Sequence, residues 1–174
     1  TLAASPLQSE IEVDGVLDEA AWGYCVEAAE MLPLRSASPT NATSFRTTYD
    51  DRNLYVGVRC GSRTGSPTTE VTEDDGRVYM DDSVEVFLGP EAGGDEYYQF
   101  IANAAGARYE GKGKDDSWEA PWQVAAKQRD KEWTLEIRIP FSAINVKPAA
   151  GDRLAFNLTR NDRSAHQNLT WADM

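Results

Sequence analysis

Hydrophobic and polar positions alternate along most of the chain, in short runs that end at polar turns. Phe45–Tyr49 and Leu54–Cys60 are two such runs, joined by the polar turn Asp50–Asn53. Alternation with a period of two is typical of half-buried β-strands, so this pair predicts a hairpin. The same pattern predicts two further hairpins, Ser83–Gly89 with Tyr97–Asn103 and Trp122–Arg129 with Trp133–Ile139.

The clearest alternation lies in Trp133–Ile139, where every second position is apolar and the positions between are polar, and Leu154–Thr159 repeats it. Such a strand is expected to have one buried and one solvated face. Helical patterns are few: Asp18–Glu30 is short with a weak apolar stripe, and Pro140–Ile144 suits a single turn. The polar stretch Thr64–Gly76 is expected to be one long loop.

Many short strands with almost no helix predict an all-β fold. We expect an antiparallel β-sandwich, two packed sheets with roughly eight to eleven strands, and one or two short helical turns. A chain of 174 residues can fill one core but is short for two, and it shows no internal repeat or linker. Residues 1–174 are therefore expected to form a single domain. Because the chain begins at Thr1, we expect a processed form or part of a larger protein.

Charge restricts the classes of partner. The formal net charge is −12, which argues against nucleic acid and against an anionic membrane surface. No apolar run approaches the roughly 20 residues of a spanning helix, so membrane insertion is not expected. A neutral polar ligand, a cation or a basic partner fits this composition better.

Cysteine and histidine offer little chemistry. Cys25 and Cys60 are the only cysteines, and two distant thiols cannot form a four-ligand zinc site. They are expected either to pair in an exported protein or to remain buried free thiols. His166, the only histidine, is predicted to lie in a loop, without a nucleophile turn nearby.

The central hairpin predicts a polar patch on one sheet face. Alternation turns Val84 and Val86 inward, so Glu85 points to the outer face of its strand and Gln99 to the same face of the next strand. A carboxylate beside an amide suits sugar hydroxyls, which both donate and accept hydrogen bonds. A solvated sheet face with a chance polar pair is the alternative.

Aromatic residues favour the sugar interpretation. The chain holds five Trp and seven Tyr, and Tyr79, Trp118 and Trp171 lie in polar surroundings. Aromatic planes stack on the C–H faces of pyranose rings while polar groups take the hydroxyls. Trp22 and Trp133, by contrast, are expected in the core.

At this point the chain resembles a family 9 carbohydrate-binding module over nearly its whole length. The resemblance rests on six segments in order: Val13–Trp22, Tyr49–Val58, Asp81–Phe87, Tyr98–Asn103, Trp133–Phe141 and Gly151–Asp162. Such modules are non-catalytic β-sandwiches, often attached to secreted xylanases, that clamp the reducing-end sugar of a glycan between two aromatic side chains. Matched position by position, the resemblance implies six ligand-binding residues: Tyr79 and Trp171 as walls, with Asn168, Glu85, Gln99 and Arg108 as polar contacts.

The resemblance carries further expectations. An oligo- or polysaccharide is the expected ligand, and linked catalytic or other domains the expected partners, in an extracellular, periplasmic or cell-surface location. Structural calcium is expected, with ligands among Asp14, Asp74, Asp75, Asp81 and Asp82. Two departures matter: a Tyr stands at position 79 where the family usually has Trp, and the sequence extends only three residues beyond Trp171.

Three alternatives stay open. A glycosidase would need Asp82 and Glu85 as its carboxylate pair, but residues three apart on a strand face opposite sides; Asp81 would share the face of Glu85 at about 13 Å, which is too far. A haem-binding redox domain of a related sandwich could use Met80 and His166 as axial ligands. The fold could also serve protein contacts or assembly without binding sugar.

Overall fold

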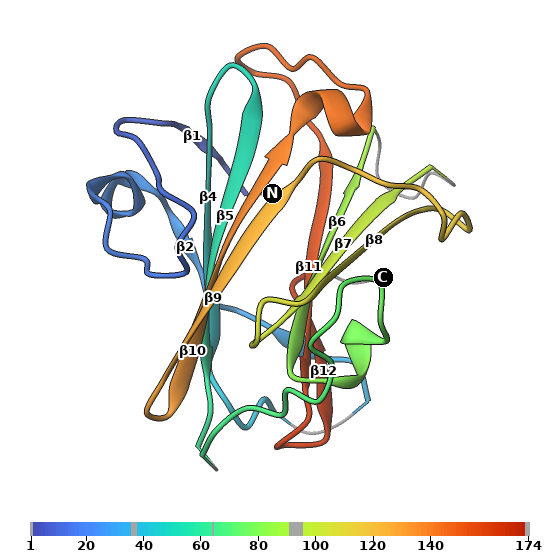
Figure 1. Ribbon diagram of the computed structural model, residues 1–174. Helices are drawn as coiled ribbons and strands as arrows, with labels where there is room; N and C mark the ends of the chain where they lie inside the picture. Colours follow the sequence, from blue (N-terminus) through green and yellow to red (C-terminus); the bar gives the residue numbers. More distant parts are fainter. Residues whose placement is uncertain (1, 36–37, 64, 91–95, 173–174) are drawn as a thin grey trace.

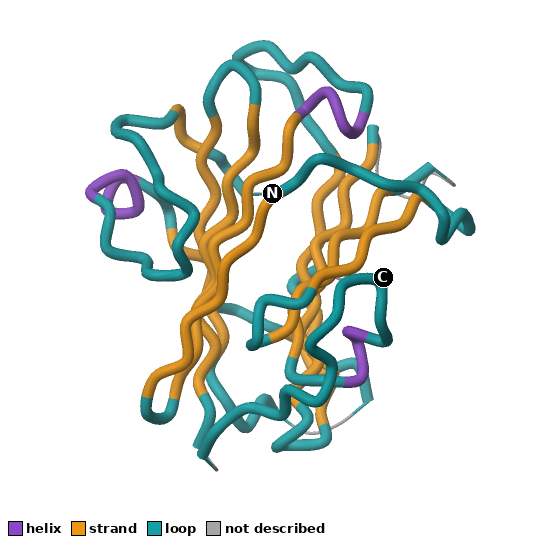
Figure 2. The backbone as a smooth tube through the Cα atoms, viewed as in Figure 1, coloured by secondary structure: helices purple, strands orange, loops and turns teal. Residues whose placement is uncertain are grey.

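The computed structural model describes residues 2–35, 38–63, 65–90 and 96–172, which form two six-stranded sheets packed face to face (Figures 1 and 2). The predicted β-sandwich is confirmed. Within these ranges the chain has twelve strands, three of which, β1, β2 and β3, contain only two residues each. The nine longer strands fall within the number expected from the sequence.

The first sheet runs in the order β1-β4-β5-β10-β9, and β2 pairs with β4. All its neighbouring strands are antiparallel except β1 and β4, which are parallel. The strands of this sheet are β1 (Ser5–Pro6), β2 (Glu27–Ala28), β4 (Thr43–Tyr49), β5 (Asn53–Gly61), β9 (Gln123–Arg129) and β10 (Glu132–Pro140).

The second sheet runs in the order β3-β12-β11-β6-β7-β8, with every neighbouring pair antiparallel. Its strands are β3 (Leu32–Pro33), β6 (Ser83–Gly89), β7 (Tyr98–Asn103), β8 (Arg108–Lys112), β11 (Ala155–Asp162) and β12 (Gln167–Thr170). The three predicted hairpins are confirmed as β4–β5, β6–β7 and β9–β10.

The main core lies between the inner faces of the two sheets. Trp133 and Leu135 of β10 are fully buried, as are Val84 and Val86 of β6. These are the alternate apolar positions of their strands, so the predicted inward faces are correct. Trp133 is a core residue, as expected.

Helical structure in the described residues is limited to three short 3-10 helices. The helical candidate Asp18–Glu30 forms only one of them, η1 (Ala20–Tyr24), and Glu27–Ala28 pairs with β4 instead. The predicted turn after Pro140 is the 3-10 helix η3 (Phe141–Ile144), and a third, η2 (Val78–Met80), precedes β6. In the part of the chain that is described, no helix is both long and apolar enough to span a bilayer.

The outer face of the first sheet is covered, which corrects the half-buried pattern predicted for β10. Thr134 and Glu136, on the face expected to be solvated, are 3% and 0% exposed. Trp22, from the N-terminal segment, is buried on this side in a second apolar cluster with Tyr55. Because this covering segment lies more than a hundred residues before β10, local alternation could not predict it.

Candidate functional site

The outer face of the second sheet carries the candidate site. On β6 the inward residues Val84, Val86 and Leu88 are at most 2% exposed, whereas Glu85 and Phe87 are half-buried on the other face. Residues 68–82 partly cover this face, and Val71 and Val78 pack on it against Ile101 of β7. The part around Glu85 of β6, Gln99 of β7 and Asn161 of β11 remains accessible.

The paired aspartates before β6 attach this covering segment to the sheet. The Asp81 carboxylate accepts hydrogen bonds from the Val71 amide and the Asn103 side chain, both at 2.9 Å. The Asp82 carboxylate accepts from the Thr68 amide at 2.8 Å and the Arg163 amide at 3.2 Å. Both aspartates are 1% exposed, and burial raises the pKa of Asp82. Their role is structural, so Asp82 is not placed as a catalytic acid.

Glu85 lies at the centre of the accessible part. Gln99 Nε2 on β7 donates a hydrogen bond of 2.7 Å to Glu85 Oε2, and Asn161 Nδ2 on β11 donates one of 2.8 Å to Glu85 Oε1. The structure therefore brings together Glu85 and Gln99, as the alternation predicted. Asn161 was missed, because only the pairing of β11 with β6 places it beside Glu85. Each carboxylate oxygen is held by one amide and keeps a lone pair for a ligand.

A cavity of about 600 Å³ opens above this carboxylate. Its aromatic members are Tyr79, which is 45% exposed, and Tyr109 on β8. The other lining residues are polar or charged apart from Gly76 and Ile101, and they include Asn168, Asp75, Asp116, Arg77 and Arg163. Tyr79, Glu85, Gln99 and Asn168, four residues suggested by the sequence, thus meet in one cavity.

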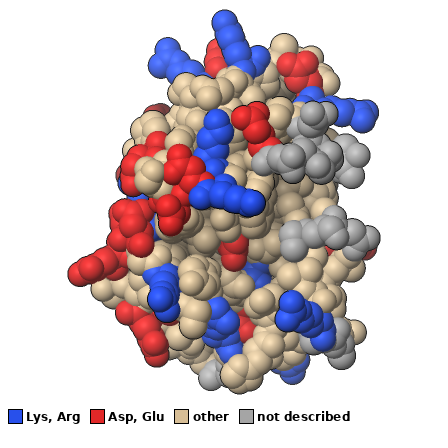
Figure 3. Space-filling model, turned by 90° about the vertical axis from the view of Figure 1, so that its right-hand side faces the viewer, with Lys and Arg blue, Asp and Glu red and all other residues tan. Residues whose placement is uncertain are grey.

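The cavity faces outward from the sheet drawn on the right of Figure 1, and Figure 3 looks onto that side of the molecule. Acidic side chains gather along the left edge of this view, and several basic side chains lie in its lower half (Figure 3). Burial, followed by the charges of Asp116 and Asp75, raises the pKa of Tyr109. The acidic members of the cavity therefore lie near β8.

The structure does not bring Trp171 to this cavity. Its ring packs edge-on against Phe45, with centroids 5.7 Å apart, and against Phe156 at 6.0 Å. Trp171 follows the alternation of Leu169, which points into the core, whereas Asn168 points outward. The expected pair of aromatic walls, Tyr79 and Trp171, does not form, because the indole ring packs against the core. The aromatic residue that joins Tyr79 in lining the cavity is Tyr109.

Arg108 also lies outside this cavity. Its guanidinium lies 5.6 Å from the centre of the Trp122 ring, donates to the Trp122 carbonyl and pairs with Asp74 at 3.3 Å. It lines a separate hollow of about 390 Å³. Since β8 alternates, the next residue, Tyr109, takes the place over the outer face. The position suggested by sequence was therefore one residue away from the side chain that lines the cavity.

Other residues singled out from the sequence lie elsewhere. Trp118 packs against Tyr98 and Phe100 at the core, and Trp22 is 2% exposed. Neither Met80 nor His166 lines the cavity; His166 is exposed in the turn between β11 and β12, as predicted.

Both cysteines are free thiols, so the alternative of a disulfide is not what the structure shows. Cys60 is fully buried on β5, and this burial raises its pKa to about 12. Cys25 is half-buried and donates to the Ala21 carbonyl. Neither thiol is a candidate nucleophile, because burial keeps both protonated.

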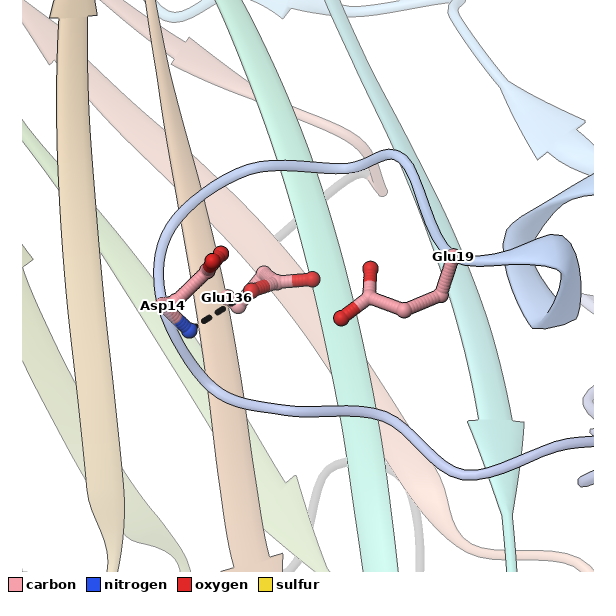
Figure 4. A group of neighbouring side chains, drawn as sticks. All are labelled: Asp14, Glu19 and Glu136. Atoms are coloured by element: carbon pink, nitrogen blue, oxygen red, sulfur yellow. Dashed lines mark hydrogen bonds between the residues drawn. The ribbon is translucent and has the colours of Figure 1, made fainter.

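Three carboxylates form a second polar group on the first sheet (Figure 4). Asp14, Glu19 and Glu136 place one oxygen each within 4.8 Å of one another, and no other group of this kind occurs among the described residues. Glu136 Oε2 accepts from the Asp14 and Gly15 amides at 3.0 and 2.9 Å, and Oε1 accepts from Trp22 Nε1 at 2.9 Å. Desolvation is the main cause that raises the pKa of Glu136 to about 7.

Carboxylate oxygens are ligands that suit calcium, so this group bears on the expected metal. However, five of its six oxygens already accept N–H hydrogen bonds: one of Asp14 and both of Glu19 and Glu136. Such a set fits a hydrogen-bonded carboxylate group better than a calcium site, which needs six to eight oxygens. Among the residues expected as ligands only Asp14 belongs to this group, and calcium binding stays a prediction.

An antiparallel β-sandwich with a polar, tyrosine-lined cavity on one outer sheet face is an architecture suited to carbohydrate binding. The comparisons agree with this class. The family model described as carbohydrate family 9 binding domain-like matches residues 13–174. The chain belongs to this family.

Solved structures share the fold at low sequence identity. A family 9 carbohydrate-binding module from Caldicellulosiruptor kristjanssonii in complex with cellotriose has a TM-score of 0.72 and 19% identity, covering 99% of this chain and 84% of that chain. The module from that organism in complex with glucose gives 0.70 and 18%, covering 97% and 85%. A presumed carbohydrate-binding protein from Bacteroides uniformis ATCC 8492 gives 0.72 and 21%, covering 99% and 89%. No curated protein matches the chain.

Proposed function

We propose that the chain binds a saccharide, without cleaving it, in the cavity above Glu85. The observation that carries this proposal is the Glu85 carboxylate, held between the Gln99 and Asn161 amides on the floor of an open cavity. Membership of a carbohydrate-binding family and the sugar complexes of two structurally similar modules support it.

The cavity offers the two kinds of contact that sugars use. Free lone pairs of Glu85 accept from hydroxyl groups, and the side chains of Gln99 and Asn168 both donate and accept. Tyr79 and Tyr109 supply aromatic surface for the C–H faces of a sugar ring. Trp171 is left out of this proposed site because its ring packs against the core, and Arg108 is left out because its guanidinium packs on Trp122.

We infer further that the domain works outside the cytoplasm, joined to catalytic or other domains. The support for this inference is the family resemblance, which implies modules of the kind attached to secreted xylanases. Immunoblots of fractionated source cells, probing the cytoplasm, envelope and medium, test the location. A purely cytoplasmic protein would contradict it.

Calorimetric titration of the purified chain with neutral and acidic oligosaccharides tests the binding proposal. Glu85→Ala should weaken binding at least about tenfold, which is about 1.4 kcal/mol, because the hydroxyl acceptor at the floor is lost. Glu132→Ala is the matched control: this glutamate lies on β10 of the other sheet and pairs with Arg59. Equal affinity in Glu85→Ala, or no binding across a broad panel, would overturn the proposal.

A further inference from the structure

Two guanidinium groups in the cavity lack carboxylate partners. Arg77 is exposed, and its guanidinium group forms no hydrogen bond or ion pair with any described residue. Arg163 donates to the Tyr79 carbonyl, forms no ion pair with a described carboxylate, and its buried Nε has no partner. Five other cations of the chain do form ion pairs with described acids: Arg46, Arg59, Arg108, Lys112 and Arg160.

Arg163 and the acidic groups Asp75 and Asp116 occupy different sides of the cavity. Asp75 and Asp116 lie near Tyr109 on β8, at one edge of the sheet. Arg163 lies on the opposite side, in the turn between β11 and β12, next to the backbone of Tyr79. Residues 75–79 cross between these sides, since the Asp75 amide bonds to β8 and the Tyr79 carbonyl accepts from Arg163. Arg77 stands midway along this crossing segment.

We propose that the sugar bound here carries a negatively charged substituent, a uronic acid carboxylate or a sulfate ester, which pairs with Arg163 and Arg77. This inference rests on the proposed function of the same cavity. A planar guanidinium binds carboxylate and sulfate oxygens through two parallel N–H donors, and such charge-assisted bonds are about twice as strong as neutral ones.

The same distribution of charge sets the orientation of the sugar. An acidic substituent placed near Tyr109 would meet Asp75 and Asp116, whereas one near Tyr79 meets the guanidinium groups. The ring hydroxyls then lie over Glu85, whose negative charge is stabilised by the Gln99 and Asn161 amides. Repulsion on one side and attraction on the other therefore select one direction.

Calorimetry with matched sugars tests the inference on the intact chain. The pairs are glucose with glucuronic acid, galactose with galacturonic acid, and glucose with glucose 6-sulfate. The acidic member of at least one pair should bind about tenfold more tightly at low salt, and the preference should shrink as salt screens the charges. Comparison of the uronic acid pairs with the glucose 6-sulfate pair shows whether the site prefers a carboxylate or a sulfate group.

Two variants assign the preference to the guanidinium groups. Arg77→Gln removes a guanidinium group that forms no hydrogen bond or ion pair with a described residue, and Arg163→Gln removes the one beside Tyr79. Each should reduce the ratio of acidic to neutral affinity severalfold, and Arg163→Lys should retain part of it. Arg129→Gln, exposed at the end of β9 on the other sheet, is the control. An unchanged ratio in the Arg77 and Arg163 variants, or equal affinity for neutral and acidic sugars, overturns this inference while saccharide binding stands. Failure of every sugar to bind overturns the proposed function with it.

Discussion

Each sheet of the sandwich holds one glutamate in mid-strand on its outer face, and the two are in opposite situations. Glu136 on β10 is fully buried and accepts three N–H hydrogen bonds from the N-terminal segment that covers it. Glu85 on β6 is half-buried, accepts two amide hydrogen bonds from its own sheet and opens onto the cavity. Burial raises the pKa of Glu136 to about 7.

This difference shows that the segment packed over a sheet face, and not the strand itself, determines whether a mid-strand carboxylate is buried or accessible. Residues 11–25 close over β10 and use Glu136 to anchor their backbone (Figure 4). Residues 68–82 cover only part of the second sheet, and their anchors are Asp81 and Asp82. Glu85 is thereby left for a ligand. Three predictions test this contrast.

The largest expected effect is on stability. Glu136→Ala should lower the free energy of unfolding by about 3 kcal/mol at pH 6, because the part-buried amide of Asp14 and the buried amide of Gly15 lose their acceptor. Glu85→Ala should cost less than about 1 kcal/mol, since its amide partners can reach water. Urea unfolding followed by tryptophan fluorescence measures both. An equal loss of unfolding free energy in the two variants would contradict this contrast.

The pH dependence of stability should carry a contribution from Glu136. Its pKa is about 7 in the folded chain against a reference of 4.5, so folding favours the protonated form. The contribution is complete below pH 4.5 and is lost as the pH rises to about 7, which amounts to about 3 kcal/mol. The free energy of unfolding should fall by about this amount over that range.

Glu136→Gln isolates this effect, because its amide stays neutral while its carbonyl still accepts the Asp14 and Gly15 amides. The variant should lose the pH slope and be at least as stable as the parent chain at pH 8. A slope identical to that of the parent chain would assign it to other acids. A rise in melting temperature at pH 8 on adding calcium, reversed by chelator, would show that the carboxylate group takes a cation instead.

The smallest effects distinguish the two aromatic residues expected as walls. Trp171→Ala should lower stability by about 2–3 kcal/mol and leave sugar affinity nearly unchanged, because its ring packs on Phe45 and Phe156. Tyr79→Ala should cost about 1–2 kcal/mol of binding free energy with little change in stability, since the ring is exposed. Thermal unfolding measures the change in stability of each variant, and calorimetric titration measures its change in sugar affinity. Reversed effects would restore Trp171 as a binding residue.

Sequence reasoning predicted the fold well where the determining pattern was local. The hairpins β4–β5, β6–β7 and β9–β10 follow from alternation and polar turns, and so does the pairing of Glu85 with Gln99. It failed where two distant segments meet. Glu136 was expected to face solvent, but residues 11–25 cover it.

The site shows the same division between local pattern and distant contact. Asn161 and Arg163 reach the cavity through the pairing of β11 with β6 and through the turn that follows, which no short window reveals. Trp171 was expected at the cavity because it is aromatic in polar surroundings and because the family resemblance implied it as the second wall. Trp171 instead follows the last residue of β12 and packs half-buried against the core, where burial of the indole ring is favourable.

The sequence alone determined that this chain forms a two-sheet β-sandwich and that Glu85 and Gln99 share an outer face, because backbone alternation fixes which side chains lie together on neighbouring strands. Only the tertiary structure decided which outer face stays open, which aromatic residues line it and where its arginines lie. These features depend on how loops from distant parts of the chain pack on the sheets, and local periodicity contains no information about that packing.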